Sequence, residues 1–247
     1  MRLLVLGGTT FLGRHVVEAA LARGHAVTLF NRGRTNPELF PGVERRVGDR
    51  DGGLEALAVG TWDAVVDTSG YVPRIVDASA RLLEPRVGRY VFVSSVSVYA
   101  DLSRPGVDED APLAALDEDT EEHRGPAYGA LKALSEHAVQ KVYGRRATVV
   151  RPGLIVGPWD PTGRFTYWPT RVAAGGEVLA PEPRRGPVQL IDARDLAAWI
   201  VHLVEGDVAG VFNAVGPERP LTMQQLLEVC CAVAGGNSRL VWAPAAW

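Results

Sequence analysis

Tyr128 and Lys132 are the two residues of this sequence whose types and spacing could move a proton. They stand four apart at the start of a stretch in which Leu134, Ala138 and Val142 recur at helical spacing, so one face of a predicted helix carries both side chains. A free tyrosine has a pKa of about 10, and a neighbouring ammonium favours its phenolate. The pair therefore predicts acid–base chemistry near neutral pH, although a packed tyrosine beside a surface lysine would leave the same spacing.

A cluster of hydroxyl groups follows the apolar residues 90–93, which predict a buried strand. Residues 94–99 read SSVSVY, so Ser95 and Ser97 stand just beyond the carboxyl end of that strand. Open α/β sheets hold their ligands at this edge. Serines at a strand end also cap turns, so the cluster alone does not establish a site.

The element that must position these groups is the first βαβ unit of the chain. Residues 2–6 predict a buried strand, helical periodicity begins at Leu12, and residues 26–30 predict a second strand. Between strand and helix the chain reads GGTTFLGR, in which Gly7 allows a sharp turn and Gly13 allows the helix to pack closely on the sheet. A helix N-terminus presents unpaired N–H groups that suit a pyrophosphate, so the unit predicts a dinucleotide site.

Four motifs in this order resemble the extended short-chain dehydrogenases/reductases. They are the turn with Gly7, Thr10 and Gly13, where Thr10 takes the place of a glycine, the SSVSVY stretch, the Tyr128–Lys132 pair and the segment RPGLIVGP at 151–158. GGTTFLGR is further similar to a GGTxFxGR branch that includes bacterial epimerase/dehydratase-like proteins and plastid RNA-binding members. The resemblance implies that Tyr128 is the general acid/base, that Lys132 holds the nicotinamide ribose and lowers the pKa of the tyrosine, and that Ser95 hydrogen-bonds the reacting oxygen.

The resemblance also implies a set of cofactor-binding residues along the carboxyl edge of the sheet. These are Gly7, Thr9, Thr10, Phe11, Leu12, Gly13, Asn31, Arg32, Arg34, Asp49, Thr68, Ser69, Gly70, Tyr128, Lys132 and Pro152. Asn31, Arg32 and Arg34 offer donors and positive charge where an acidic residue would bind the ribose 2′-hydroxyl, so NADP(H) is favoured over NAD(H). Solvated arginines in an exposed loop are the alternative, as is turn chemistry for Asp49.

The expected architecture is α/β, a Rossmann-type doubly wound parallel sheet with a small C-terminal substrate lobe. We expect residues 1–152 to form the dinucleotide-binding core and 153–247 a substrate lobe interleaved with the last core elements, shorter than in similar proteins. Residues 101–127 carry nine acidic side chains and predict a solvated surface loop beside the site. Further elements are expected as strands at 43–47, 64–67, 147–150, 211–215 and 239–242, and as helices at 72–83, within 189–205 and at 222–234.

Composition limits the classes of function. The formal net charge is −3, from 29 acidic and 26 basic residues, which gives no electrostatic case for a dedicated nucleic-acid or membrane binder. The five histidines show no metal-ligand spacing, so no metal is expected. The adjacent Cys230 and Cys231 fit a reducing cytoplasm, and no leader or membrane-spanning segment is expected.

The function expected from these observations is that of an NAD(P)-dependent oxidoreductase of the epimerase, dehydratase or reductase type. Its substrate would be a sugar nucleotide or another small carbonyl compound, and a homodimer is expected by resemblance. Val188 stands where nucleotide-sugar enzymes often carry a phosphate-binding arginine, which weakens the sugar-nucleotide interpretation. The alternative from another class is an RNA-binding or regulatory protein on the same fold.

Overall fold

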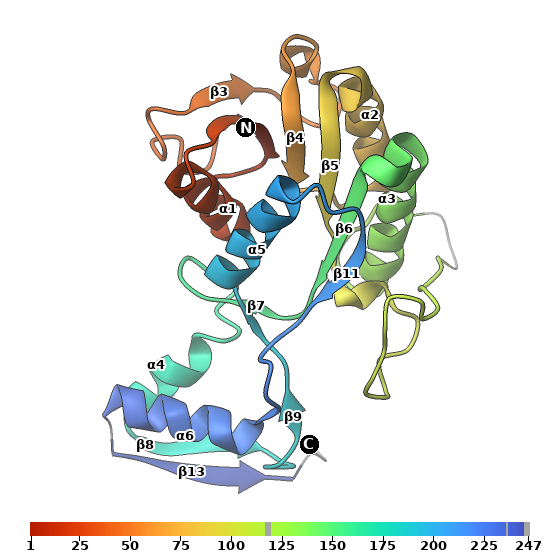
Figure 1. Cartoon of the computed structure of the whole chain (residues 1–247). Helices are drawn as coiled ribbons and strands as arrows, with labels where there is room; N and C mark the ends of the chain where they lie inside the picture. Colours follow the sequence, from red (N-terminus) through yellow and green to blue (C-terminus); the bar gives the residue numbers. More distant parts are fainter. Residues whose placement is uncertain (117–119, 236, 245–247) are drawn as a thin grey trace. The chain divides into compact units, whose positions relative to one another are not determined.

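The computed structural model describes residues 1–116, 120–235 and 237–244, and it divides into two compact units. The first comprises residues 1–153 and 193–214. Its centre is a seven-stranded sheet in which every neighbouring pair is parallel, in the order β11-β6-β5-β4-β1-β2-β3 (Figure 1). The strands are β1 (Arg2–Leu6), β2 (Ala26–Asn31), β3 (Glu44–Val47), β4 (Trp62–Asp67), β5 (Val87–Val93), β6 (Ala147–Pro152) and β11 (Gly210–Ala214).

The central strands are buried on both sides because their sequences are almost continuously apolar. In β1, Leu3, Leu4, Val5 and Leu6 are all fully buried. Leu4 lies opposite Thr28 of β2 and Val65 of β4, which fixes the register at the centre of the sheet. Each such side chain contributes about 2 kcal/mol by leaving water, so the sheet centre is a large part of the core.

Four helices cover the sheet in two pairs. Helices α1 (Phe11–Ala22) and α5 (Ala193–Glu205) pack together on one face, and α2 (Pro73–Leu83) and α3 (Tyr128–Tyr143) pack together on the other (Figure 1). A proline at the first position starts α2, where its missing N–H costs no hydrogen bond. The expected doubly wound α/β architecture is confirmed, since helices cover both faces of a parallel sheet.

The predicted acidic loop is anchored to the core in its first part. The backbone of Ala114 donates to the carbonyl of Val98 at 2.7 Å, and Arg151 donates to the carbonyl of Glu109 at 3.1 Å. Arg151 also forms a buried, two-point ion pair with Glu136 of α3, at 2.7 and 3.0 Å. Residues 117–119 of this loop lie outside the described residues.

The second unit comprises residues 154–192 and the described residues from 215 onward. It holds helices α4 (Tyr167–Ala173) and α6 (Met223–Ala234) and three two-stranded ladders. Thr222 and Gln225 form the expected capping box at the start of α6, with reciprocal bonds of 3.2 and 2.9 Å. The strands are β7 (Ile155–Val156), β8 (Gly176–Pro181), β9 (Pro187–Val188), β10 (Ile191–Asp192), β12 (Leu221–Thr222) and β13 (Ser238–Ala243).

None of the helices in the described part of the chain is both long enough and apolar enough to span a bilayer.

Candidate functional site

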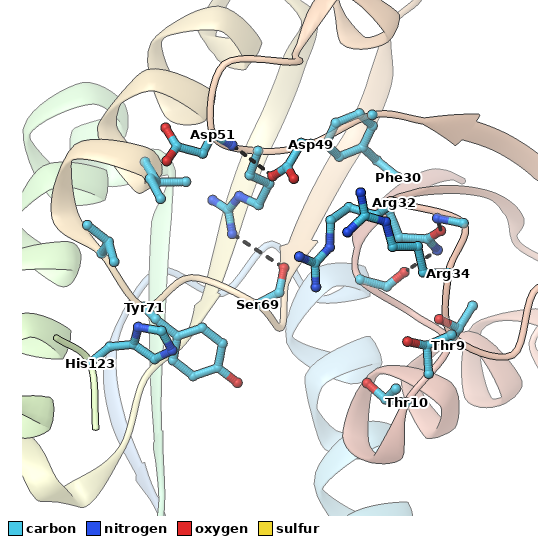
Figure 2. Close-up of a pocket in the computed structure, with 18 residues that line it drawn as sticks. Thr9, Thr10, Phe30, Arg32, Arg34, Asp49, Asp51, Ser69, Tyr71 and His123 are labelled. Atoms are coloured by element: carbon cyan, nitrogen blue, oxygen red, sulfur yellow. Dashed lines mark hydrogen bonds between the residues drawn. The ribbon is translucent and has the colours of Figure 1, made fainter. Parts of the chain in front are cut away.

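A cavity of about 390 Å³ opens at the carboxyl edge of the sheet, within the first unit. It is bounded by the glycine turn after β1, by the loops after β2, β3 and β4, and by the start of α2. Figure 2 shows Tyr71 and His123 side by side on one side of the cavity and Arg32, Arg34 and Thr9 on the other. Parallel α/β sheets bind their ligands at this edge.

The turn after β1 has no room for additional side chains at its glycines. Gly7 has φ +107°, and a Cβ on Gly13 would lie 2.8 Å from the backbone nitrogen of Gly8. Helix α1 therefore starts directly against the turn, as expected for a dinucleotide fold. Thr10, the residue that departs from the glycine motif of the resemblance, is exposed and lines the cavity.

The side chain of Asn31 holds backbone groups at the end of β2. Its amide nitrogen donates to the carbonyl of Gly7 at 2.9 Å, and its oxygen accepts from the backbone of Gly33 at 2.9 Å. Asn31 also lines the cavity. Its amide is therefore committed to joining the glycine turn to the loop that follows β2.

Arg32 and Arg34 are exposed and both line the cavity. Within the described residues neither guanidinium pairs with a carboxylate. Two other charged residues of the lining are paired: Arg50 with Asp67 at 2.7 Å, and Asp51 with Arg74 at 2.7 Å. Asp49 also lines the cavity, so one carboxylate stands against the two arginines. The loop after β2 thus supplies net positive charge to the cavity, which favours an anionic ligand.

The lining residue Arg50 belongs to a buried polar cluster around Asp67, which is fully buried at the end of β4. Its two oxygens accept from Arg50 and from the hydroxyl of Tyr90, each at 2.7 Å. Arg50 also donates to Ser79 of α2 at 2.7 Å. Burial, with the charge of Asp67, holds the pKa of Tyr90 well above its ordinary value, so Tyr90 stays a hydrogen-bond donor.

Part of the acidic loop reaches the mouth of the cavity. The His123 ring stacks on Tyr71, with centroids 5.2 Å apart and planes at 30°. Arg74 bridges Glu121 of the loop and Asp51 of the lining, at 2.8 and 2.7 Å. The expected position of this loop beside the site therefore matches the structure, and contacts between exposed side chains join the loop to the start of α2 and to the segment after β4.

The start of α3 lies against the serine cluster. A Cβ on Gly129 would fall 2.0 Å from the carbonyl oxygen of Ser97, so only glycine permits this approach. Tyr128, the first residue of α3, and Ser95 are both partly exposed. The Ser95 hydroxyl accepts from the backbone of Ser97 and donates to its hydroxyl, both at 3.1 Å, so it also caps the turn at 96–98.

Lys132 lies one helical turn after Tyr128 and is only 3% exposed. Its Nζ donates to the carbonyl oxygens of Gly70 and Val93, at 2.6 and 2.7 Å, and lies 4.2 Å from the Phe92 ring centroid. Burial lowers the pKa of Lys132 to about 7, against the opposing charges of Asp67 and Glu136. The lysine therefore titrates near neutrality at the carboxyl ends of β4 and β5.

The structure gathers only part of the predicted cofactor set around the cavity. The predicted residues that line it are Gly7, Thr9, Thr10, Asn31, Arg32, Arg34, Asp49 and Ser69. Those that do not line it are Phe11, Leu12 and Gly13 in the first turn of α1, Thr68 and Gly70 after β4, Tyr128 and Lys132 on α3, and Pro152 at the end of β6. Asp49 also accepts from the backbone of Asp51 at 3.1 Å, which is the turn chemistry that was its alternative.

Several lining residues were missed by the sequence reasoning. Arg50 and Asp51 directly follow the predicted Asp49, and Tyr71 and Val72 directly follow Gly70, so extending the expected strand-end segments would have found them. His123 had no such signal, because it lies in a loop without periodicity. Among the described residues, no group of His, Cys, Asp or Glu side chains is arranged to hold a metal ion.

Comparison with known proteins gives relatives that are longer than this chain. The chain is 27% identical over 255 residues to a chloroplast stem-loop binding protein of 41 kDa from Arabidopsis thaliana, covering 95% of this chain and 63% of that protein. It is 28% identical over 261 residues to the 2′-dehydrokanamycin reductase of Streptomyces kanamyceticus, covering 100% of this chain and 70% of the reductase. The chain thus spans less than two thirds of the Arabidopsis protein.

The fold also matches a solved structure, the UDP-N-acetylglucosamine 4-epimerase of Bacillus cereus, with a TM-score of 0.78 at 19% identity over 99% of this chain and 85% of that one. The model of the NAD dependent epimerase/dehydratase family matches residues 3–215, which include the glycine turn and all of the parallel sheet except its first residue, Arg2. This match covers well over half of the chain. The chain therefore belongs to the NAD dependent epimerase/dehydratase family.

Proposed function

We propose that this protein is an NAD(P)-dependent oxidoreductase of the epimerase, dehydratase or reductase type. It would exchange a hydride at a carbonyl or carbinol carbon of a small molecule. The observation that carries the proposal is the cavity at the carboxyl edge of the sheet, bounded by a glycine turn and by two arginines without carboxylate partners. A dinucleotide needs this combination of close backbone approach and positive charge.

The chain offers residues suited to the pyrophosphate and adenosine part of a bound dinucleotide. Gly7 and Gly13 keep side chains away from the turn where a pyrophosphate would lie, and Ser69 and Asp49 border the same cavity. When bound, the nicotinamide supplies hydride acceptance and donation. The residues present therefore fit the cofactor that the family description names.

Tyr128 is proposed to transfer the proton and Ser95 to hydrogen-bond the reacting oxygen. The close contact at Gly129 supports this assignment, because it brings the start of α3 against the turn that Ser95 caps. Lys132 would stabilise the phenolate when its ammonium is protonated. Since burial lowers the pKa of Lys132 to about 7, its charge would depend on pH in the neutral range.

NADP(H) is proposed as the preferred cofactor. The reason is that Arg32 and Arg34 are exposed in the loop after β2, while no acidic residue stands at the end of that strand. Such positive charge attracts the 2′-phosphate of NADP(H), and NAD(H) has no phosphate at that position. The substrate class proposed is a sugar nucleotide or another small carbonyl compound, the first prompted by the solved epimerase and the second by the Streptomyces reductase.

The test of cofactor binding is a titration of the purified protein with NADP(H) and NAD(H), followed by cofactor fluorescence and thermal shift. Saturable binding with tighter affinity for NADP(H) is the expected result. The double substitution Arg32→Ala and Arg34→Ala should weaken the binding of NADP(H) and leave the binding of NAD(H) nearly unchanged. Absence of binding to either cofactor would reject the proposed function.

The test of chemistry is turnover in a screen of carbonyl compounds and sugar nucleotides. Tyr128→Phe should reduce turnover by at least about 100-fold, as expected for loss of a general acid/base. Tyr143→Phe provides a matched control at the other end of α3, because the Tyr143 hydroxyl has no hydrogen-bond partner within the described structure. Equal losses in the two variants would contradict the assigned role of Tyr128.

RNA binding, which the name of the Arabidopsis relative prompts, is the alternative function and is not favoured. The net charge of −3 provides little attraction for a polyanion. RNA retention that persists at raised salt would favour the alternative.

Cys230 and Cys231 are both free thiols, which supports our proposal of a reducing cytoplasm as the location.

A further inference from the structure

We propose that Asn36 is a positioning residue that joins the glycine turn to the arginine-bearing loop and thereby strengthens binding of NADP(H). This inference rests on the proposed function, since it concerns how the same cavity is prepared for the cofactor. Asn36 lies in the loop between β2 and β3 and belongs to none of the motifs that predicted the site. It does not itself line the cavity.

The contact that carries the inference is a hydrogen bond across 27 residues of sequence. The Asn36 amide nitrogen donates to the carbonyl of Thr9 at 2.8 Å, and this bond is partly buried. Asn31 makes the corresponding bond to the carbonyl of Gly7 at 2.9 Å. Two asparagines therefore hold two alternate carbonyl groups of the same turn.

These bonds add to the pairing of carbonyl groups around the turn. Leu6 accepts from the hydroxyl of Thr68 at 3.0 Å, and Thr10 accepts from the backbone of Arg14 at 3.2 Å. With Gly7 and Thr9 held by the asparagines, four carbonyl oxygens accept from protein donors. Since carbonyl oxygens repel a pyrophosphate and N–H groups attract it, fixing the acceptors in this way favours an anionic ligand.

The backbone is in the left-handed region at Asn36 and close to the other end of the contact, at Phe11. Asn36 has φ +44° and Phe11, two residues after Thr9, has φ +31°. Asparagine tolerates this region better than most residues, whereas phenylalanine there is strained. Such strain persists only where the surroundings hold it, and the Asn36 bond is one of the contacts that hold the turn.

The same contact also limits the freedom of the arginines. Arg32 and Arg34 lie between Asn31 and Asn36, so the segment that carries them is tied to the glycine turn at both ends. A tied loop loses less conformational entropy when it closes on a ligand than a free one. Asn36 should therefore support the groups for the 2′-phosphate as well as those for the pyrophosphate.

The test compares Asn36→Gly and Asn36→Ala with the wild type. Glycine keeps the left-handed backbone and removes only the amide, whereas alanine removes the amide and also disfavours φ +44°. Glu38→Gln, an exposed change in the same loop, is the matched control. Two readouts are measured for each protein: hydrogen exchange of the peptide covering residues 7–14 without cofactor, and dissociation constants for NADP⁺ and NAD⁺.

Asn36→Gly should speed hydrogen exchange in residues 7–14. It should also raise the dissociation constant for NADP⁺ about fivefold, which is the equivalent of one hydrogen bond. The affinity for NAD⁺ should fall less, since NAD⁺ has no 2′-phosphate for the arginines to bind. Asn36→Ala should lose at least as much affinity for NADP⁺ as Asn36→Gly. Unchanged exchange and affinity in Asn36→Gly, with normal binding by the wild type, would overturn the inference alone. A wild type that binds neither dinucleotide would overturn the proposed function and this inference together.

Discussion

The burial of Lys132 and its lowered pKa can be tested directly by measuring how the stability of the protein depends on pH. The Lys132 Nζ is nearly inaccessible to water and has two carbonyl partners, and burial lowers its pKa from the usual 10.5 to about 7. Between those two values the unfolded chain holds the lysine proton and the folded chain does not. The unfolded state then binds more protons, so the free energy of unfolding must rise with pH in this range.

The magnitude follows from the pKa values. Between about pH 6 and pH 9 the lysine should add roughly 2 to 3 kcal/mol to the free energy of unfolding, at about 1.4 kcal/mol for each pH unit above the folded pKa. Lys132→Met removes the titrating group. It also leaves the carbonyl groups of Gly70 and Val93 without this donor, but that cost is the same at both pH values.

The assay is urea unfolding of the cofactor-free protein at the two pH values, with linear extrapolation to water. The difference in free energy of unfolding between the wild type and Lys132→Met should grow by roughly 2 to 3 kcal/mol from about pH 6 to pH 9. Lys141 is an exposed lysine on the same helix, so the free energy of unfolding of Lys141→Met should change with pH as that of the wild type does. Parallel curves for Lys132→Met would refute the lowered pKa and the burial that causes it.

Three further substitutions test contacts around the site. Gly129→Ala should lower the free energy of unfolding by about 2 kcal/mol or more and abolish turnover, because its Cβ would overlap the carbonyl of Ser97. An unchanged melting temperature would contradict that contact. Arg50→Met should lower the free energy of unfolding in urea by about 3 to 5 kcal/mol at neutral pH, since it leaves the Asp67 carboxylate buried without its cation; an unchanged free energy would contradict the importance of this pair. Tyr143→Phe should stabilise by about 1 kcal/mol in urea unfolding, because it removes a buried hydroxyl without a partner; destabilisation would indicate a partner for that hydroxyl.

The parallel sheet could be predicted from sequence because its signals are local. Apolar runs of Leu and Val marked β1, β4 and β6, and the glycine turn marked the first crossover. The strand ends were less accurate: β5 begins at Val87 and β6 extends to Pro152, beyond the expected ranges. Pairing with neighbouring strands decides where a strand ends, and local periodicity does not contain that information.

The polar network of the site was largely beyond sequence reasoning. Arg50 reaches from the end of β3 to Asp67 at the end of β4, and His123 stacks on Tyr71 from a loop without periodicity. Both contacts join segments that are distant in sequence, so neither leaves a pattern in its own segment. Asn31 was expected near the ribose, yet its amide also serves the backbone of Gly7, and only the folded structure reveals that bond.

The connectivity of the first unit has a consequence for how the chain folds. Strand β6 acquires its outer neighbour β11 only after residues 154–192 of the second unit and all of α5 have been synthesised. Until then the nascent sheet exposes an apolar, unpaired edge at β6, which is the kind of edge that associates with other chains. Parallel pairing across so many residues is also slow, because the intervening loop must close first. Folding of the whole domain should therefore depend on synthesis beyond Ala214, and chaperone demand should be greatest just before that point.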